Sequence, residues 1–372
     1  MQKAESLIRE ILSHADVEVN GERPWDITVH NTRLYQRLLR EGVMGLGESY
    51  MDEWWDCEDL EQFIVKVLKA DLEHVIHPLK LLLPVLRAKL INVQSKKRAA
   101  KDVNSHYGLG DVLFRNMLGE SMAYTCGYWK DVDNLDDSQE AKFDLICRKF
   151  GLYRGARVLD VGCGWGSFLK YAADNYGVTG VGITISEEHV KLSKELCSAL
   201  PIEIRLQDYR DLNDQQFDFI VGIGVIEAFG PKNHKTFMNI VNKHLKDDGL
   251  FLLHTIGSND AKYSTDPWTE RYIFPGSYLP TIEQIAKAAN GALVIEDVHN
   301  FGNDYATTLQ AWNDNFVSNW ETTISKHYDQ RFYRMWTYML QTYAGSFRAR
   351  RNQLWQIVFS KKGVPGGYAS VR

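Results

Sequence analysis

The sequence predicts an α/β protein in which a parallel sheet, covered by helices on both faces, follows a small and mainly helical region. Three observations support this fold class. From residue 157 onward, short runs of β-branched and aliphatic residues recur, and helix-spaced apolar residues separate the early runs. Residues 1 to about 90 lack this rhythm. At 372 residues, the chain is long enough for one large domain and a smaller one.

The small domain is predicted to span residues 1–92. Apolar residues recur with helical spacing at 6–12, 34–40 and 60–72, and residues 27–31 are typical of one short strand. Residues 42–51 contain three glycines and predict a turn before Trp54 and Trp55. Residues 79–90 are strongly apolar, which suits either a packing surface or a helix lying on a bilayer. We expect this domain to contact lipid or to form a dimer.

A basic segment at residues 93–104 is predicted to link the two domains. Its charges suit either a solvated linker or attraction to anionic lipid. The large domain then covers residues 105–372.

The large domain is predicted to hold seven strands. They are residues 157–161, 180–184, 203–206, 217–223, 250–255, 293–299 and 353–360. Helices are expected at 187–199 and 234–245, the second closed by residues 246–249. An aromatic-rich helical insertion, at about 303–350, separates the last two strands and is suited to cover an apolar substrate.

The stretch VLDVGCGWGS at residues 158–167 is the strongest single motif. It predicts a strand, a tight glycine turn and the start of a helix, with Asp160 before the first glycine. A dinucleotide fold would require G-x-G-x-x-G with an acid about 20 residues later. The G-x-G-x-G spacing fits an adenosylmethionine pocket better, although a purely structural turn is the alternative. Other polar segments also follow predicted strands, and ligands of parallel sheets bind at that edge.

Composition excludes several classes of protein. A net charge of −5 argues against a dedicated nucleic-acid binder. No apolar run reaches the roughly 18 residues of a membrane span, and the N-terminus lacks the order of a signal peptide, so we expect a cytoplasmic protein. The five cysteines form no C-x-x-C pair, which predicts free thiols and no metal site.

An ordered set of motifs resembles the cyclopropane-fatty-acyl-phospholipid synthases, relatives of the mycolic acid cyclopropane synthases. The motifs are QSKKR at 94–98, HY at 106–107, AYTCGYW at 123–129, VLDVGCGWG at 158–166, QDYRD at 207–211, GPKN at 230–233, LHTIG at 253–257, YIFP at 272–275, HNFG at 299–302 and FRAR at 347–350. The resemblance covers residues 6 to 360. It implies a class I methyltransferase with a Rossmann-like seven-stranded sheet and a small, mainly helical N-terminal domain.

The resemblance also implies a reaction and its site residues. The methyl carbon of S-adenosylmethionine would be transferred to the cis double bond of an unsaturated phospholipid acyl chain, and bicarbonate would remove a proton as the cyclopropane ring closes. The implied bicarbonate cage is Cys126, Glu227, His254, the backbone at Ile256, and Tyr305. The implied cofactor residues are Tyr107, Thr125, Asp160, Gly162, Gly164, Thr184, His189, Gln207, Asp208 and Tyr209. Tyr128, Trp129 and Phe274 are candidates for the acyl channel, with ordinary core aromatics as the alternative.

Several positions depart from the family pattern. His189 stands where a glutamine normally reaches the ribose, Ala228 replaces a histidine next to Glu227, and Gly108 replaces an aspartate. These departures bear on cofactor affinity and on ring closure more than on the class of reaction.

Two other functions remain open at this point. A relative could methylate the same alkene and yield a methyl-branched or methylene chain. A non-catalytic lipid-binding protein could keep the fold. For the leading function, the resemblance further implies a homodimer that associates peripherally with the inner face of the membrane.

Overall fold

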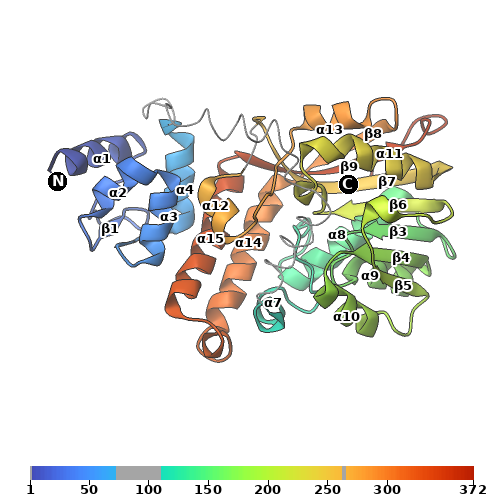
Figure 1. Cartoon of the computed structure of the whole chain (residues 1–372), viewed down its shortest axis with the longest axis horizontal. Coiled ribbons are helices and arrows are strands. Elements are labelled where there is room, and N and C mark those ends of the chain that lie inside the picture. Colours follow the sequence, from blue (N-terminus) through green and yellow to red (C-terminus); the bar gives the residue numbers. More distant parts are fainter. Residues whose placement is uncertain (1, 73–109, 262–264) are drawn as a thin grey trace.

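The computed structural model describes residues 2–72, 110–261 and 265–372. The predicted apolar helix at 79–90, the basic linker at 93–104, Gly108 and Tyr107 lie outside the described residues. Within the described ranges, the chain forms a small domain, a covered sheet and a helical hairpin between them (Figure 1).

Residues 2–72 form the small domain, in which helices surround a two-stranded antiparallel ribbon. Its elements are α1 (Gln2–His14), β1 (Thr28–Val29), α2 (Leu34–Glu41), α3 (Val43–Met51), β2 (Trp55–Asp56) and α4 (Leu60–Lys69). Asp59 begins α4 by accepting a hydrogen bond from the Gln62 N–H at 2.8 Å. The predicted strand at 27–31 contains β1, whereas its partner β2 was not predicted.

The predicted turn at 42–51 is wrong, because this segment forms helix α3. Its glycines allow close packing. A Cβ on Gly45 would lie 2.8 Å from the carbonyl oxygen of Arg37, and one on Gly47 would lie 2.5 Å from the Trp268 ring. The glycines therefore let α3 approach α2 and the Trp268 side chain, and they do not end the helix.

The large domain contains the predicted seven-stranded sheet, in the order β5-β4-β3-β6-β7-β9-β8. Its strands are β3 (Arg157–Val161), β4 (Thr179–Thr184), β5 (Ile202–Leu206), β6 (Phe217–Ile223), β7 (Leu245–Ser258), β8 (Val294–Asn300) and β9 (Asn352–Ser360). The expected parallel pairing holds from β5 to β7, whereas β9 runs antiparallel to both β7 and β8. Residues 246–249, expected to close a helix, belong to β7.

Helices cover both faces of the sheet (Figure 1). They are α8 (Leu135–Phe150), α9 (Ser167–Tyr176), α10 (Glu187–Leu196), α11 (His234–His244) and α13 (Ile282–Ala289), with single turns η2 (Tyr209–Asp211), η3 (Ile226–Ala228) and η4 (Pro231–Asn233) in the connecting loops. Two shorter helices lie away from the sheet: α7 (Asp111–Met117) packs on the insertion between β8 and β9, and α12 (Pro267–Tyr272) packs on α3. Successive strand residues point to opposite cores: Val158 packs with α8 and α9, and Leu159 packs with α11 and α13. This alternation explains why the inner strands, such as β3 and β4, are mainly apolar.

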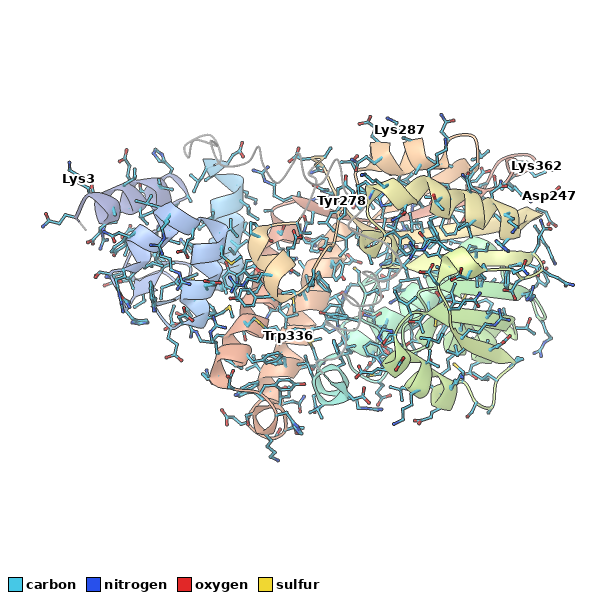
Figure 2. The ribbon with its side chains drawn as sticks, viewed as in Figure 1. Lys3, Asp247, Tyr278, Lys287, Trp336 and Lys362 are labelled. Atoms are coloured by element: carbon cyan, nitrogen blue, oxygen red, sulfur yellow. The ribbon has the colours of Figure 1, made fainter. Side chains whose placement is uncertain are left out.

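The insertion between β8 and β9 forms a helical hairpin of α14 (Gly302–Ser318), η5 (Ile324–Lys326) and α15 (Gln330–Arg348). It lies between the small domain and the sheet (Figure 1), and its buried Trp336 is labelled in Figure 2. The Trp336 indole N–H contacts the sulfur of Met117 at 3.0 Å. One continuous apolar core therefore runs from the small domain through the hairpin.

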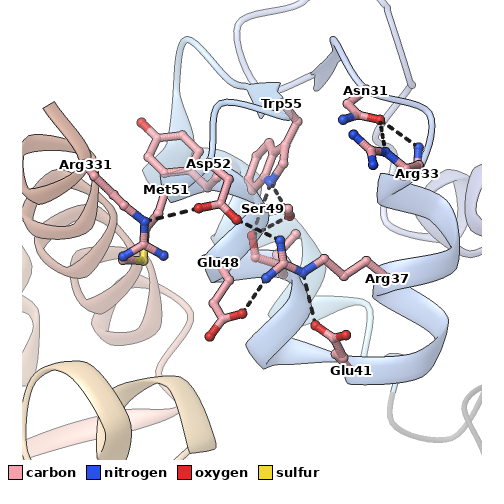
Figure 3. Close-up of polar contacts among 12 residues, drawn as sticks. Asn31, Arg33, Arg37, Glu41, Glu48, Ser49, Met51, Asp52, Trp55 and Arg331 are labelled. Atoms are coloured by element: carbon pink, nitrogen blue, oxygen red, sulfur yellow. Dashed lines mark hydrogen bonds and ion pairs between the residues drawn. The ribbon is translucent and has the colours of Figure 1, made fainter.

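A charged cluster joins the small domain to the hairpin (Figure 3). The Arg37 guanidinium of α2 donates to Glu41 at 3.0 Å, to Asp52 at 2.9 Å and to Glu48. Arg331 of α15 donates to the same Asp52 at 3.1 Å. Because the Arg37 side chain is only 14% exposed, this network is better shielded from water than ordinary surface ion pairs. It helps to fix α3 against α15.

Candidate active site

A cavity of about 660 Å³ begins at the carboxyl ends of the parallel strands and reaches the small domain. Its wall at the sheet comes from the loops after β3, β4, β5 and β6. Its wall farther out comes from α15 and from Ile64 and Leu68 of α4. The cavity therefore joins a polar end at the sheet to an apolar end at the small domain, which is the shape expected for two dissimilar ligands that meet.

The glycine loop after β3 forms one side of the polar end. Gly162 and Gly164 adopt positive φ angles of 76° and 53°. The N–H groups of Gly162 and Cys163 both donate to the Ile183 carbonyl, which holds the loop over β4. A Cβ on Gly164 would enter open space. The chain thus presents bare backbone to the cavity at this point.

Asp160, the last but one residue of β3, lines the polar end with a buried carboxylate that is 2% exposed. Its Oδ1 has no hydrogen-bond partner among the described residues. Burial raises the pKa of Asp160 to about 7, and the nearby Lys142 opposes that rise. A cationic group placed in the cavity would satisfy this oxygen, so the site fits the ammonium of an amino-acid ligand.

The residues predicted for the ribose and adenine also line this end: Thr184, His189, Gln207, Asp208 and Tyr209. The His189 ring lies 4.6 Å from the Trp165 ring, and burial lowers the His189 pKa to about 4. The Tyr209 ring packs on Phe229 at 4.4 Å. These flat aromatic surfaces suit the faces of a nucleoside.

Asp208 and Gln207 already have partners within their own loop. The Asp208 carboxylate pairs with Arg210 at 2.6 Å, and the Gln207 amide donates to the Asp211 carbonyl at 3.0 Å. These bonds fix both side chains within the loop, and a contact with adenine would be made in addition to them.

The two ends of the cavity meet at four of the five predicted cage residues: Glu227, His254, Ile256 and Tyr305. Glu227 follows β6, His254 and Ile256 lie on β7, and Tyr305 lies on α14. The Tyr305 ring packs on Phe347 of α15 at 4.7 Å. The sheet and the hairpin therefore contribute jointly to this junction.

Glu227 and His254 each present a buried polar atom without a partner in the described part of the chain, Oε2 and Nε2 respectively. Burial raises the pKa of Glu227 to about 7 and lowers that of His254 well below its usual value. The Gln356 amide nitrogen lies 3.4 Å from His254 Nδ1, and a hydrogen bond donated by this amide would leave the imidazole proton on Nε2. The junction thus holds one donor and one proton-exchanging carboxyl group.

Two details of the cage differ from the sequence-based expectation. The Ile256 N–H, expected to face the bound base, donates to Glu227 Oε1 at 2.7 Å. Cys126 is fully buried but is not one of the described residues that line the cavity. Its thiol donates to the Gly127 carbonyl at 3.1 Å, and burial raises its pKa well above the usual value.

The predicted channel aromatics separate into two groups. Phe274 lines the cavity, whereas Tyr128 and Trp129 are not among the described lining residues. Tyr128 packs edge-on against Phe301 at 5.2 Å, and the Trp129 indole donates to Thr308 at 2.9 Å. Tyr128 is buried and Trp129 is half-buried. Leu309, Trp312, Met339 and Tyr343 of the hairpin form the apolar wall instead.

Sequence reasoning missed Lys142 and Gln139 of α8, which lie directly beneath Thr125. The Lys142 ammonium donates to the Thr125 hydroxyl at 2.9 Å, and the Gln139 amide donates to the Thr125 carbonyl at 2.8 Å. A signal was present, because residues 135, 138, 139, 142, 145, 146 and 149 lie on one helical face that also carries core leucines. Polar residues on such a face indicate a buried polar contact.

The strand order, the glycine loop and the acid at the end of β3 define a class I methyltransferase that uses S-adenosylmethionine. Comparison with known proteins is more specific. The model of the mycolic acid cyclopropane synthetase family matches residues 94–357, and the chain belongs to this family. It is 50% identical over 367 residues to the cyclopropane-fatty-acyl-phospholipid synthase of Escherichia coli K12, covering 98% of this chain and 95% of that protein.

Solved structures give the same family. The cyclopropane synthase MmaA2 from Mycobacterium tuberculosis is 28% identical, with a TM-score of 0.66 over 70% of this chain and 98% of its own. The mycolic acid cyclopropane synthase CmaA1, complexed with SAH and CTAB, is 30% identical with the same TM-score and the same coverage. Both structures match about the length of the large domain.

Proposed function

We propose that this enzyme transfers the methyl carbon of S-adenosylmethionine to the cis double bond of unsaturated phospholipid acyl chains and closes a cyclopropane ring. The observation that carries the proposal is the single cavity that joins the glycine loop to an apolar chamber, with Glu227 and His254 at the junction. The 50% identity to the Escherichia coli synthase, over nearly the whole of both chains, supports the same reaction.

The chemistry explains why the cavity needs this shape. An unactivated alkene is a weak nucleophile, so the enzyme must hold it against the electrophilic methyl group that the bound cofactor supplies. Water would compete for that group and must be excluded. Hairpin residues such as Leu309 and Trp312 form an apolar wall that does both. Their aromatic members also tolerate positive charge that develops on the acyl chain.

Ring closure requires the removal of a proton, and we propose bicarbonate as the base. The free Nε2–H of His254 is a donor suited to an anionic oxygen, and the free Oε2 of Glu227 is suited to a bicarbonate hydroxyl. Because the pKa of Glu227 is about 7, this carboxyl group can accept the proton that reaches it. Tyr305 and the backbone near Ile256 complete this side of the cavity.

We further propose that the enzyme reaches its substrate as a homodimer bound peripherally at the inner face of the membrane. Val43 lines the cavity and is 50% exposed, so the cavity approaches the surface at α3. Nearby in the chain, Leu39 of α2 is 45% exposed. Among the described residues, no helix combines the length and apolarity needed to cross a bilayer. Vesicle sedimentation and light scattering test the membrane and dimer proposals separately.

The deciding experiment supplies the purified protein with vesicles of unsaturated phospholipid, methyl-labelled S-adenosylmethionine and bicarbonate. High-field cyclopropane signals in the proton NMR spectrum of the recovered fatty acids are expected, weakened when bicarbonate is removed. Labelled chains without these signals would mean a methyl-branched or methylene product. An absence of label in the lipid would contradict the proposed reaction.

A further inference from the structure

Lys142 is a completely buried lysine that the mechanism above does not use. Its side chain is 0% exposed, although lysine is almost never fully buried without a specific partner. It lies on α8, beneath the segment that carries Thr125. A buried ammonium is costly to desolvate, so its retention in this position calls for a role.

Two side chains of α8 hold Thr125 at both of its oxygens. The Lys142 ammonium donates to the hydroxyl at 2.9 Å, and Gln139 donates to the main-chain carbonyl at 2.8 Å. Lys142 also donates to the side-chain oxygen of Gln139, which orients the Gln139 amide. Because the Thr125 oxygen accepts from an ammonium, its single proton must point to a different acceptor.

A ligand bound in the cavity could supply that acceptor. Thr125 and Asp160 both line the polar end of the cavity. Asp160 brings an unpartnered carboxylate oxygen, and Thr125 brings a hydroxyl proton whose direction Lys142 controls. One acceptor and one charge-supported donor match the ammonium and the carboxylate of an amino acid.

We propose that Lys142 is a positioning residue for S-adenosylmethionine, holding the Thr125 hydroxyl so that it donates to the cofactor's carboxylate while Asp160 accepts from the cofactor's ammonium. The inference rests on the cofactor site and not on the acyl substrate or on bicarbonate. Burial moves the pKa values of Lys142 and Asp160 toward each other, both to about 7, and each charge favours the other. The zwitterionic end of the cofactor complements this pair.

The chain contains a matched control in Lys149. It lies on the same helix, is 2% exposed as a whole residue, and burial lowers its pKa to about 7 as well. Its ammonium contacts His299 at 3.2 Å and does not contact Thr125. Lys149→Met therefore removes a buried lysine from α8 without removing the proposed function.

The test compares two ligands by calorimetry in the absence of lipid. S-adenosylhomocysteine has the amino-acid end, and methylthioadenosine lacks it. Lys142→Met is expected to lower the affinity for S-adenosylhomocysteine by at least about 10-fold, while the affinity for methylthioadenosine changes by less than about 2-fold. Lys149→Met should change neither of these two affinities by more than about 2-fold. Equal losses for both ligands in Lys142→Met, or no loss for either, would overturn the proposal.

A double-mutant cycle tests whether Lys142 acts through Thr125. Thr125→Val alone should lower the affinity for S-adenosylhomocysteine but not that for methylthioadenosine. The double variant with Lys142→Met should bind S-adenosylhomocysteine no more weakly than the more affected single variant does. Fully additive losses would overturn the positioning role. If Lys142→Met does not fold, Lys142→Gln replaces it in both experiments, since it removes the charge and keeps an amide donor. Its selective loss supports the proposal, and equal losses for both ligands overturn it.

Discussion

The carboxylate of Glu227 accepts a hydrogen bond from the Ile256 N–H at 2.7 Å, and this bond connects the loop after β6 to β7. It occupies Oε1 and leaves Oε2 facing the junction of the cavity. One oxygen of Glu227 therefore fixes the orientation of the group, and the other is available for chemistry.

The first prediction concerns Glu227→Gln. Turnover should fall about 100-fold or more, because the amide cannot accept a proton, while the affinity for S-adenosylhomocysteine should remain unchanged. Labelled-methyl incorporation and calorimetry measure the two quantities. The control is Glu283→Gln on the exposed surface of α13, which should preserve both. Normal turnover in Glu227→Gln would exclude Glu227 from the proton path.

The second prediction concerns stability and pH. The folded pKa of Glu227 is about 7, above the ordinary value of 4.5. Between these values the unfolded chain releases the proton first, so this group lowers the free energy of unfolding as pH rises from about 4.5 to 7. Glu227→Gln should match the wild type at pH 4.5 or below and exceed it at pH 8 by up to about 3 kcal/mol.

Urea unfolding at pH 4.5 and pH 8 measures this difference. The pH-dependent contribution of Asp160 to stability is the same in both proteins, so it drops out of the comparison. Equal stability of the two proteins at pH 8 would show that Glu227 ionises in the fold without a cost.

The third prediction concerns the apolar end of the cavity. Leu68→Trp places a larger side chain at the wall that α4 supplies, so activity should fall more for vesicles with longer acyl chains than for those with shorter ones. Leu7→Trp is the control for added bulk, because Leu7 is 43% exposed on α1. The measurement is incorporation of label into two phospholipids that differ only in chain length. An equal loss for both would place the acyl chain elsewhere.

The fourth prediction concerns the contact between α15 and α4. A Cβ on Gly345 would lie 2.8 Å from the Glu61 carbonyl and 2.8 Å from Ile64. Alanine favours a helix by about 1 kcal/mol over glycine, but overpacking costs about 1–3 kcal/mol. Gly345→Ala should therefore lower the midpoint of thermal unfolding, whereas Gln341→Ala on the same helix should change it little. A higher midpoint in Gly345→Ala would mean that α4 moves aside freely.

The sheet was predicted closely because its inner strands, such as β3, β4 and β9, are buried on both faces and are therefore mainly apolar. The direction of β9 was missed, since apolar patterning shows that a strand is buried but not which way it runs. Helix α3 was mistaken for a turn because its glycines indicate a turn in the sequence. In the fold, Gly45 makes room for the backbone of Arg37, and Gly47 makes room for the Trp268 ring.

The site shows the same limit. Glu227 follows an apolar strand and His254 interrupts one, but a buried histidine is as well explained by the core, so His254 was assigned to the site from the family resemblance. Lys142 resembles any solvated helical lysine until the whole face of α8 is considered, and its contact with Thr125 exists only after folding. Sequence motifs therefore predict part of the proposed adenosylmethionine site, whereas the residues that support it can be identified only in the structure.

The hairpin of α14 and α15 is one uninterrupted insertion between two strands, yet it supplies Tyr305, most of the apolar wall and the surface that meets the small domain. The glycine loop and Asp160 come from a different part of the chain. Substrate preference can therefore diverge by changes within a single contiguous stretch, while the half that binds the nucleoside stays constant. A graft of residues 302–348 between relatives that share the tyrosine at position 305 is a direct way to exchange acyl preference while the cofactor site is kept.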